Sequence, residues 1–464
     1  MESVFPPEKN RAQTAPFETW ADFAGHLENL GLFRMNPGTA RLAGLLDKLG
    51  RRRSSMPLAQ VVGTNGKGST CTFLASLARA HGLSCILHSS PHFVCVRERV
   101  RLFRPGGRRE GELLPEAAWL EAANTALAAG GAELTYFELI TLLAVILLER
   151  EKADLAVMES GLGGTFDATT ALEADLVLFA PIARDHLDVL GRSLAEIAAD
   201  KAGALRPGGA AISSGQEKEA ADILRREARL KASSLSFVRK EPEPDSGKIR
   251  LGLEGEYQKE NAALALAAWK FLAPLCRTRS RREAETEGLG AAWIPGRLQR
   301  IVPAPDKDLP GLILDGGHNP HALAALGQSL ARLGIAPAAV IFNCMQDKEP
   351  EKLVPHLRIL SAGPVFVPGL PGNSRAMSPE ILAGLIGLSA VPAKDLRAAL
   401  DLAGAHCRER LPEAAYRRIP ESGNGKEPWR PLLICGSLYL LGEFFALYPQ
   451  YLLAPEPEKE NSYE

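Results

Sequence analysis

The 464-residue sequence lacks the features that mark membrane and secreted proteins. Its longest apolar run, Leu139–Leu148, contains one threonine and is about half as long as a membrane-spanning helix. The segment Met1–Pro16 is polar and proline-bearing, without a hydrophobic stretch of the signal-peptide type. We therefore expect Leu139–Leu148 to form a buried helix in a cytoplasmic protein that does not enter a membrane.

The chain has neither a cysteine framework nor an excess of charge. Its seven cysteines are scattered, without a Cys-x-x-Cys pair, which favours reduced thiols over disulfides or a zinc site. A formal net charge of −1 offers no basic face to nucleic acid. With 46% apolar and 23% charged residues, the composition is typical of a globular enzyme, and the length predicts two or three domains. We expect a monomer.

What the sequence does contain is a glycine-rich octet between a predicted strand, Leu58–Val62, and a helical pattern, Cys71–Ala78. Glycines let backbone N–H groups approach an anion, and the helix dipole adds partial positive charge there. We therefore predict a phosphate-binding loop, with Lys67 on the outer phosphates and the Ser69 hydroxyl on magnesium. The octet is Gly63, Thr64, Asn65, Gly66, Lys67, Gly68, Ser69 and Thr70.

The octet departs from the common GxxxxGK[ST] pattern. Val61 stands where that pattern has its first glycine, and Gly68 separates Lys67 from Ser69. A glycine-rich turn before a helix can also be a simple tight connection. Three glycines, a lysine and several hydroxyl groups within eight residues favour phosphate binding over that alternative.

Short apolar strands alternate with amphipathic helices along the chain, which predicts a parallel sheet in each half. Unusual polar clusters follow six of these strands. Ligands of open α/β sheets bind outside the carboxyl ends of the strands, so we expect an active site in a cleft between two domains. The clusters are GTNGKGS, SSPH, ESGLGG, RDH, DGGHNP and GS.

A change in composition predicts the domain boundary. The dense charge run Arg277–Glu287 is followed by a Pro-Gly-Arg segment, after which the alternation of strands and helices restarts. We assign residues 1–297 to the first domain, 298–453 to the second and 454–464 to a disordered tail. The charged, proline-rich stretch Arg239–Arg250 predicts an exposed hairpin or insertion.

The octet resembles the phosphate loop of the Mur-ligase superfamily, and more closely that of folylpolyglutamate synthase and dihydrofolate synthase. The resemblance covers about Asn36 to Gly442, with SPH, TYFE, GLGG, DAT, DH, DKAG, DGGHNP and GSLY in the family's order. It implies an α/β fold, with a P-loop-containing parallel-sheet ATPase domain and a smaller Rossmann-like C-terminal domain. It also implies ATP and two magnesium ions as cofactors.

Four residues are candidate metal ligands: Ser69, Glu159, His186 and Lys201. Glu159 ends a strand that we expect to be buried, where a carboxylate must be paired or bound to a cation. A lone histidine such as His186 is more often a cap or a core imidazole, but the resemblance implies that Glu159 and His186 bind magnesium. Taken alone, Lys201 would be a solvated lysine at a helix end. In many relatives it is carbamylated and helps to hold a second magnesium, which requires a lysine with a lowered pKa.

Two motifs border the substrate pocket of the family. Thr135 and Glu138 form a capping-box pattern, and the resemblance adds that Thr135 and Phe137 border the pterin. Asp167 and Ala168 belong to a DAT segment near the same pocket. The family commonly has arginine and asparagine where this chain has threonines, at positions 165 and 170, which places the pterin specificity in question.

Further residues resemble those that contact the nucleotide. Gln258 and Asn261 match the family's adenine-contacting residues, although Tyr257 replaces a histidine. Arg297 resembles an arginine that reaches the phosphates, which suits a guanidinium on a linker that closes.

The DGGHNP segment supplies the last candidates. Asp315 and His318 resemble residues that contact the nucleotide; the alternative is an Asp-Gly turn capped by His318, with Pro320 starting a helix. Lys67, Lys201 and His318 are the candidate catalytic residues.

The resemblance implies an ATP-dependent amide ligase of folate biosynthesis and one-carbon metabolism. Its substrates would be L-glutamate and either dihydropteroate or a folate, and we expect one bifunctional enzyme for both. Two alternatives remain: another Mur-type ligase, against which TYFE, DAT and SPH speak, and a P-loop nucleotide-binding module without ligase activity.

Overall fold

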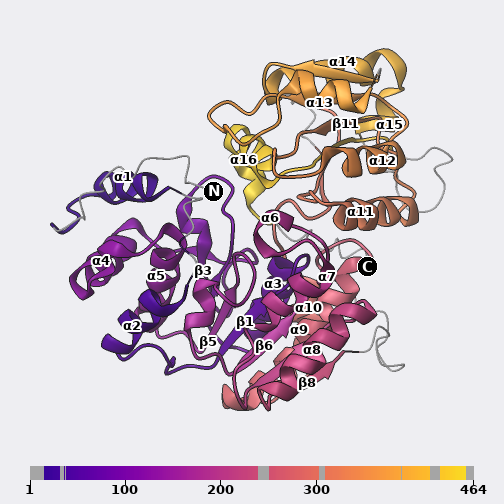
Figure 1. Cartoon of the computed structure of the whole chain (residues 1–464). Helices are drawn as coiled ribbons and strands as arrows, with labels where there is room; N and C mark the ends of the chain where they lie inside the picture. Colours follow the sequence, from indigo (N-terminus) through magenta and orange to yellow (C-terminus); the bar gives the residue numbers. More distant parts are fainter. Residues whose placement is uncertain are drawn as a thin grey trace, which may run out of the picture.

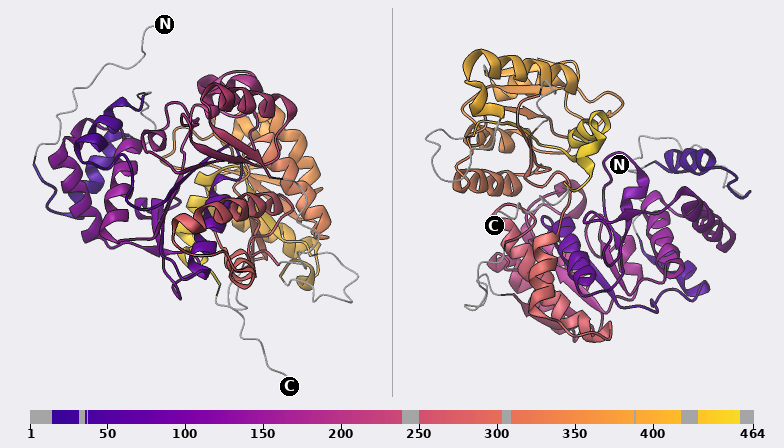
Figure 2. Two further views of the ribbon diagram at one scale, coloured as in Figure 1. Left: turned by 90° about the horizontal axis from the view of Figure 1, so that it is seen from below. Right: turned by 180° about the vertical axis from the view of Figure 1, so that it is seen from behind.

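The computed structural model describes residues 15–31, 36, 38–238, 250–302, 309–387, 389–417 and 429–455. These residues form two α/β halves, each built on its own sheet (Figure 1). The view from behind shows the same division, with the C-terminal half in orange and yellow (Figure 2).

The first sheet has eight strands in the order β4-β3-β2-β5-β1-β6-β7-β8. β1 lies at its centre, parallel to β5 on one side and β6 on the other, while β2–β3 and β3–β4 pair antiparallel. The strands are β1 (Leu58–Val62), β2 (Cys85–His88), β3 (Val100–Phe103), β4 (Glu112–Leu113), β5 (Leu155–Glu159), β6 (Leu176–Phe179), β7 (Ala210–Ser213) and β8 (Ser234–Phe237).

Helices cover both faces of this sheet because the residues of β1 alternate between two cores. Ala59 and Val61 pack with α3 and α9, whereas Leu58 and Val62 belong to the core that contains α4 and α5. The helices are α1 (Trp20–Leu30), α2 (Ala40–Lys48), α3 (Lys67–Ala80), α4 (Glu116–Ala129), α5 (Tyr136–Arg150), α6 (Leu187–Leu190), α7 (Leu194–Ala202), α8 (Lys218–Leu230), α9 (Tyr257–Leu275) and α10 (Arg282–Ala291).

The second sheet has six strands in the order β13-β12-β11-β14-β10-β9, and β9 alone among them pairs antiparallel. Its strands are β9 (Gln299–Ile301), β10 (Leu312–Leu314), β11 (Ala339–Phe342), β12 (Val365–Pro368), β13 (Ala390–Ala393) and β14 (Leu432–Cys435). Ile313 faces the core with α11, α12 and α13, and Leu312 and Leu314 face the core with α14 and α16. The helices are α11 (Pro320–Arg332), α12 (Pro350–Leu360), α13 (Pro379–Ile386), α14 (Leu396–Arg410), α15 (Glu413–Arg417) and α16 (Leu438–Leu447).

The predicted fold class is confirmed, with parallel-dominated sheets in both halves. The sequence patterns missed the edge strands β8 and β13, which are mostly half-buried or exposed and therefore carry little apolar signal. The charge run Arg277–Glu287 runs into α10, and α10 packs on α3: a Cβ at Gly288 would lie 2.8 Å from the Leu77 Cα. The first half therefore continues beyond the charge run.

Other expectations have different outcomes. Leu139–Leu148 lies in α5 and is buried, as predicted. Of the proposed insertion, residues 239–249 lie outside the described residues, and so do residues 456–464 of the proposed tail. Within the described ranges, no helix combines the length and the hydropathy that crossing a bilayer requires.

Candidate functional site

A cavity of about 860 Å³ lies between the two halves. It is lined at the carboxyl ends of β1, β5 and β6 from the first half and of β10 and β14 from the second. The predicted site residues that line it are Gly63, Thr64, Asn65, Gly66, Lys67, Gly68, Ser69, Thr135, Phe137, Glu159, Asp167, Ala168, His186, Lys201, Asn261, Arg297, Asp315 and His318. Thr70 and Gln258 are fully buried beneath this surface.

The phosphate loop connects β1 to α3 as predicted. Gly66 caps α3 with φ at +80°, a left-handed conformation that suits glycine, and a Cβ there would collide with the Asn261 side chain. The Lys67 ammonium donates to the carbonyl oxygens of Gly63 at 3.2 Å and Thr64 at 3.3 Å. Lys67 therefore folds back over its own loop, beside the helix N-terminus where an anion would be stabilised.

Lys201 is buried, and is not the solvated lysine at a helix end that its sequence position alone suggested. Its side chain is 3% exposed, and its ammonium donates to the Gly63 carbonyl at 3.0 Å, next to Lys67. Burial, followed by the charge of Lys67, lowers the pKa of Lys201 to about 7. A substantial fraction of this amine is therefore neutral near neutral pH.

Among the candidate metal ligands, Ser69 and Glu159 offer the oxygen donors that magnesium prefers, whereas His186 offers a nitrogen. Glu159 is 5% exposed, accepts a hydrogen bond from the Ser90 N–H at 3.1 Å, and has its pKa raised by burial, only partly offset by Lys67. Burial lowers the pKa of His186 to about 4, so its imidazole is neutral, as a metal ligand must be. Among the described residues, no three His, Cys, Asp or Glu side chains form a metal site by themselves. Phosphate oxygens would have to complete the coordination, as is usual for magnesium.

Gln258 and Asn261 lie under the phosphate loop. The side-chain amide of Gln258 donates to the Ser69 hydroxyl oxygen at 3.2 Å, and the Asn261 side chain donates to Gln258 Oε1 at 2.9 Å. The pair therefore orders Ser69 and the loop, and of the two only Asn261 reaches the cavity surface.

The predicted substrate side is built on α5 and on the DAT turn. Thr135 and Glu138 form the capping box, and Phe137 packs so closely that a Cβ on Gly161 would lie 2.8 Å from its ring. Buried Asp167 accepts hydrogen bonds from the Leu162 and Thr169 N–H groups at 2.9 and 3.0 Å.

The two threonines that depart from the family pattern serve the fold. Thr165 donates to the Asp200 carbonyl of α7 at 2.8 Å, and Thr170 donates to the Gly164 carbonyl at 2.7 Å. The sequence interpretation missed Phe166, which lines the cavity and is 60% exposed. The sequence did contain a signal for Phe166, because an aromatic residue is unusual inside a glycine-rich polar turn.

Asp315 and Arg297 approach each other at the boundary of the halves. Asp315 accepts hydrogen bonds from the Leu298 N–H at 2.9 Å and the Tyr257 hydroxyl at 3.1 Å, and burial raises its pKa against the nearby charge of Arg297. Pro320 begins α11 as expected, but its cap is Asn319 rather than His318. His318 lines the cavity, and its Nδ1 contacts the Gly316 carbonyl at 2.8 Å.

A polar junction across the cavity was not predicted. Asp185 of the first half is 2.5 Å from the Lys348 ammonium, accepts from the Asn319 amide at 3.0 Å and is 3.6 Å from His318 Nε2. Burial alone would raise the pKa of Asp185, but the hydrogen bond from His318 and the charge of Lys348 outweigh it and hold the pKa far below its ordinary value. The sequence gives no signal for the pairing of Asp185 with Lys348, because the two residues are 163 positions apart.

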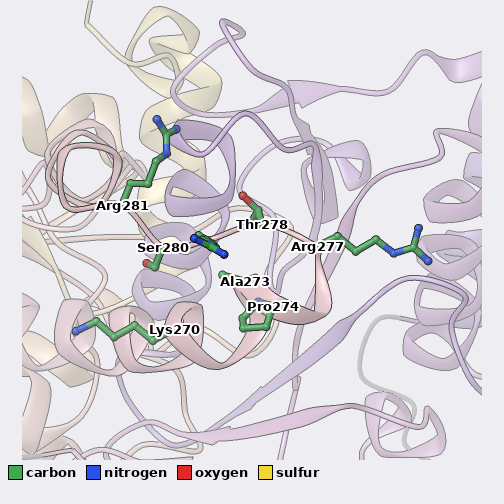
Figure 3. Close-up of a pocket in the computed structure, with 8 residues that line it drawn as sticks. Lys270, Ala273, Pro274, Arg277, Thr278, Ser280 and Arg281 are labelled. Carbon is green, nitrogen blue, oxygen red and sulfur yellow. The ribbon is translucent and has the colours of Figure 1, made fainter.

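A second hollow, of about 750 Å³, lies at the end of α9. Its four basic residues are Lys270, Arg277, Arg279 and Arg281. The charged ends of Lys270, Arg277 and Arg281 point in different directions (Figure 3). All four are exposed, and they surround a helix C-terminus, where the dipole disfavours an anion. This hollow does not have the character of a substrate site.

No family model matches the chain. A dihydrofolate synthase/folylpolyglutamate synthase of Escherichia coli (strain K12) is 32% identical over 361 residues, covering 72% of this chain and 78% of that protein. A probable bifunctional folylpolyglutamate synthase/dihydropteroate synthase of Haloferax volcanii is 31% identical over 445 residues, 90% of this chain and 49% of that protein. The chain therefore spans about half the length of this second relative.

The solved structures that resemble this chain come from the same kind of protein as these relatives. The structure of E. coli FolC in complex with DHPP and ADP superposes with a TM-score of 0.76 at 26% identity, covering 93% of this chain and 98% of that one. The bifunctional folylpolyglutamate synthase/dihydrofolate synthase of Yersinia pestis, complexed with AMPPNP and a Mn ion, gives a TM-score of 0.77 at 26% identity, with 94% and 100% covered. The chain belongs to the folylpolyglutamate synthase/dihydrofolate synthase family of the Mur-ligase superfamily.

Proposed function

We propose that this chain is an ATP-dependent ligase that joins L-glutamate to the carboxylate of dihydropteroate or of a folate. The observation that carries the proposal is the convergence of half-buried Lys67 and buried Lys201 on one carbonyl, at 3.2 and 3.0 Å, in a cavity that Arg297 also lines. A polyanion bound beside Lys67 and Arg297 would balance their charge. The nucleotides bound by the E. coli and Y. pestis proteins are such polyanions.

The reaction would proceed in two displacements. A carboxylate oxygen of the substrate attacks the γ-phosphorus of ATP, and ADP leaves with the electrons of the broken P–O bond. The neutral amine of glutamate then attacks the acyl carbon, loses a proton, and expels inorganic phosphate. Charge develops on phosphoryl oxygens in both steps, so positioned cations lower the barrier. Lys67 and Arg297 would supply that charge, and His318 would help to position the nucleotide.

Magnesium would be held by the Ser69 hydroxyl, the Glu159 carboxylate and the neutral imidazole of His186, together with phosphate oxygens. When bound, it would neutralise phosphate charge and orient the γ-phosphate. A second ion would require an anionic ligand from Lys201. Carbamylation of that lysine forms an N–C bond between its neutral amine and carbon dioxide, with loss of one proton. The lowered pKa of Lys201 supports this modification.

The aromatic and carboxylate groups near α5 would hold the pterin. Thr135, Phe137, Asp167 and Ala168 are the residues that we assign to it, and the exposed ring of Phe166 extends the same wall. The E. coli FolC structure contains DHPP, and the E. coli relative is named for both a dihydrofolate synthase and a folylpolyglutamate synthase. We therefore propose that one pocket of this chain accepts both pteroate and folate substrates.

We further propose that residues 1–297 form the ATP-binding domain and residues 298–453 the C-terminal ligase domain. Both would act together as a monomer in the cytoplasm, in folate biosynthesis and one-carbon metabolism. Gel filtration of the purified chain tests the oligomeric part, since a dimer would elute at twice the 49.8 kDa mass.

ADP release tests the function. Release that requires both dihydropteroate or tetrahydrofolate and L-glutamate supports the proposal. Release that requires another carboxylate or amine would indicate a different Mur-type ligase, and release without either would indicate a nucleotide-hydrolysing module.

A further inference from the structure

Arg99 is a buried cation beside the phosphate loop that neither the family motifs nor the proposed reaction uses. It is the last residue of the 3-10 helix Val96–Arg99 and is 3% exposed. Its carbonyl accepts from the Ser89 N–H at 2.9 Å, which fixes its backbone to the turn after β2. Its side chain reaches the wall of the interdomain cavity.

Within the described residues, the hydrogen-bond and ring partners of Arg99 are neutral. Its Nε donates to His92 Nδ1 at 2.8 Å, and its guanidinium carbon lies 5.3 Å from the centre of the Tyr136 ring. The neighbouring Glu98 is occupied by the backbone N–H groups of residues 93–95, at 2.7 to 3.0 Å. Among the described carboxylates, none forms a contact ion pair with Arg99, although the charge of Glu159 acts on it through space.

A buried guanidinium without a directly bonded counter-charge is unfavourable. Burial accordingly lowers the pKa of Arg99, with Tyr136, Tyr439 and the charge of Glu159 opposing the shift. Tyr439 belongs to the second half and also lines the cavity, so the guanidinium faces the space between the halves. An anion bound in that space would complete its pairing.

The neighbours of Arg99 indicate which anion of the reaction it would bind. On one side it contacts Tyr136, the neighbour of Phe137, whose ring belongs to the proposed pterin wall. The same guanidinium also interacts electrostatically with Glu159, the carboxylate that accepts from the Ser90 N–H on the phosphate side of the cavity. Arg99 therefore lies between the two ends of the site, where the carboxyl group of a substrate would meet the nucleotide.

We propose that Arg99 binds the substrate carboxylate that accepts the phosphoryl group. This inference rests on the proposed function and adds a residue that recognises the acid substrate. A guanidinium recognises a carboxylate by charge-assisted hydrogen bonds, and the second carboxylate oxygen remains available for the attack on phosphorus. His92 and Tyr136 would hold the guanidinium in place before the substrate arrives.

Comparing the binding of pteroate with that of its carboxamide distinguishes carboxylate binding by Arg99 from a structural role. The affinities of the parent chain, Arg99→Gln and Arg99→Lys are measured for pteroate and for the carboxamide of pteroate, with ADP and magnesium present. Arg101→Gln is the matched control, because Arg101 is a half-buried arginine on the next strand that does not line the cavity. ADP affinity and thermal melting are recorded for every variant.

We expect the parent to bind pteroate about 10- to 100-fold more tightly than the carboxamide, the size of one charged hydrogen-bonding contact. Arg99→Gln should reduce that ratio to near one with ADP affinity unchanged, Arg99→Lys should retain part of it, and Arg101→Gln should keep it. An unchanged ratio in Arg99→Gln would overturn the assignment and leave the ligase function standing. A parent that neither binds pteroate nor consumes ATP with it would overturn both.

A measurement on the parent chain covers the case in which Arg99→Gln does not fold. The parent is crystallised with ADP, magnesium and pteroate. The Arg99 guanidinium should lie within hydrogen-bond distance of the pteroate carboxylate. A bound pteroate whose carboxylate is held by other groups would contradict the assignment.

Discussion

The interdomain cavity and the hollow at the end of α9 are similar in size, about 860 and 750 Å³, and both are lined by basic side chains. They differ in burial and direction. Lys67, Lys201 and Arg99 are wholly or partly withdrawn from water and face one space, whereas the charged ends in the hollow are exposed and point apart (Figure 3).

The difference shows what distinguishes a site from a basic surface. Solvent screens exposed charges and leaves little interaction for a ligand. In the cavity, burial and then the charge of Lys67 lower the pKa of Lys201 to about 7. If this comparison is correct, removing a lysine from the cavity should reduce activity, whereas removing one from the hollow should leave it unchanged.

Lys67→Ala should produce the largest loss. The substitution removes a cation beside the proposed phosphates, so turnover should fall by roughly 10²–10³ or more, with melting nearly unchanged because Lys67 is part of no core. ADP release and thermal melting measure the two effects. Lys270→Ala in the hollow is the matched control and should retain activity; an active Lys67→Ala enzyme would remove the phosphate-loop assignment.

Lys201→Ala should lose about 10²-fold in turnover yet remain folded, and acetate or formate should restore part of it. The small anion would occupy the gap left by the carbamate. Because only the neutral amine captures carbon dioxide, reactivation of decarbamylated parent enzyme at a fixed concentration of dissolved carbon dioxide should be faster above pH 7 than below it. ¹³C NMR after labelled bicarbonate checks the modification, and a bare amine in a fully active enzyme would exclude it.

Glu159→Gln should have an intermediate effect. The amide has the same shape but carries no charge, so the magnesium concentration for half-maximal activity should rise by about 10- to 100-fold. Saturating magnesium should recover most of the turnover. A magnesium titration identical to that of the parent would make Glu159 a structural residue.

The smallest effect is expected in the hollow. The double variant Arg277→Ala with Arg281→Ala removes two exposed cations, and its activity and ATP dependence should stay within about twofold of the parent. A large change in the KM for ATP or for the acid substrate would show that the hollow belongs to the site.

Much of the fold and of the site was predictable because its signals are local. Apolar runs such as Leu58–Val62 and the capping box Thr135–Glu138 define elements from neighbouring residues alone. The polar clusters after the strands came together as expected, because parallel strands share one edge.

The remainder depends on tertiary context. The pairing of Asp185 with Lys348 and the burial of Arg99 follow from how two sheets meet, which no single segment encodes. Lys201 resembled a solvated helix-end residue for the same reason, since its burial arises from the distant loop at Gly63.

The most direct test of the central claim is ADP release by the purified chain with ATP and magnesium. Dihydropteroate and L-glutamate are supplied together, singly or not at all, and the products are identified by mass spectrometry. We predict release only when both are present, with one glutamate added to the pteroate carboxylate for each ADP. ADP release that ignores both substrates, without any glutamylated product, would contradict it.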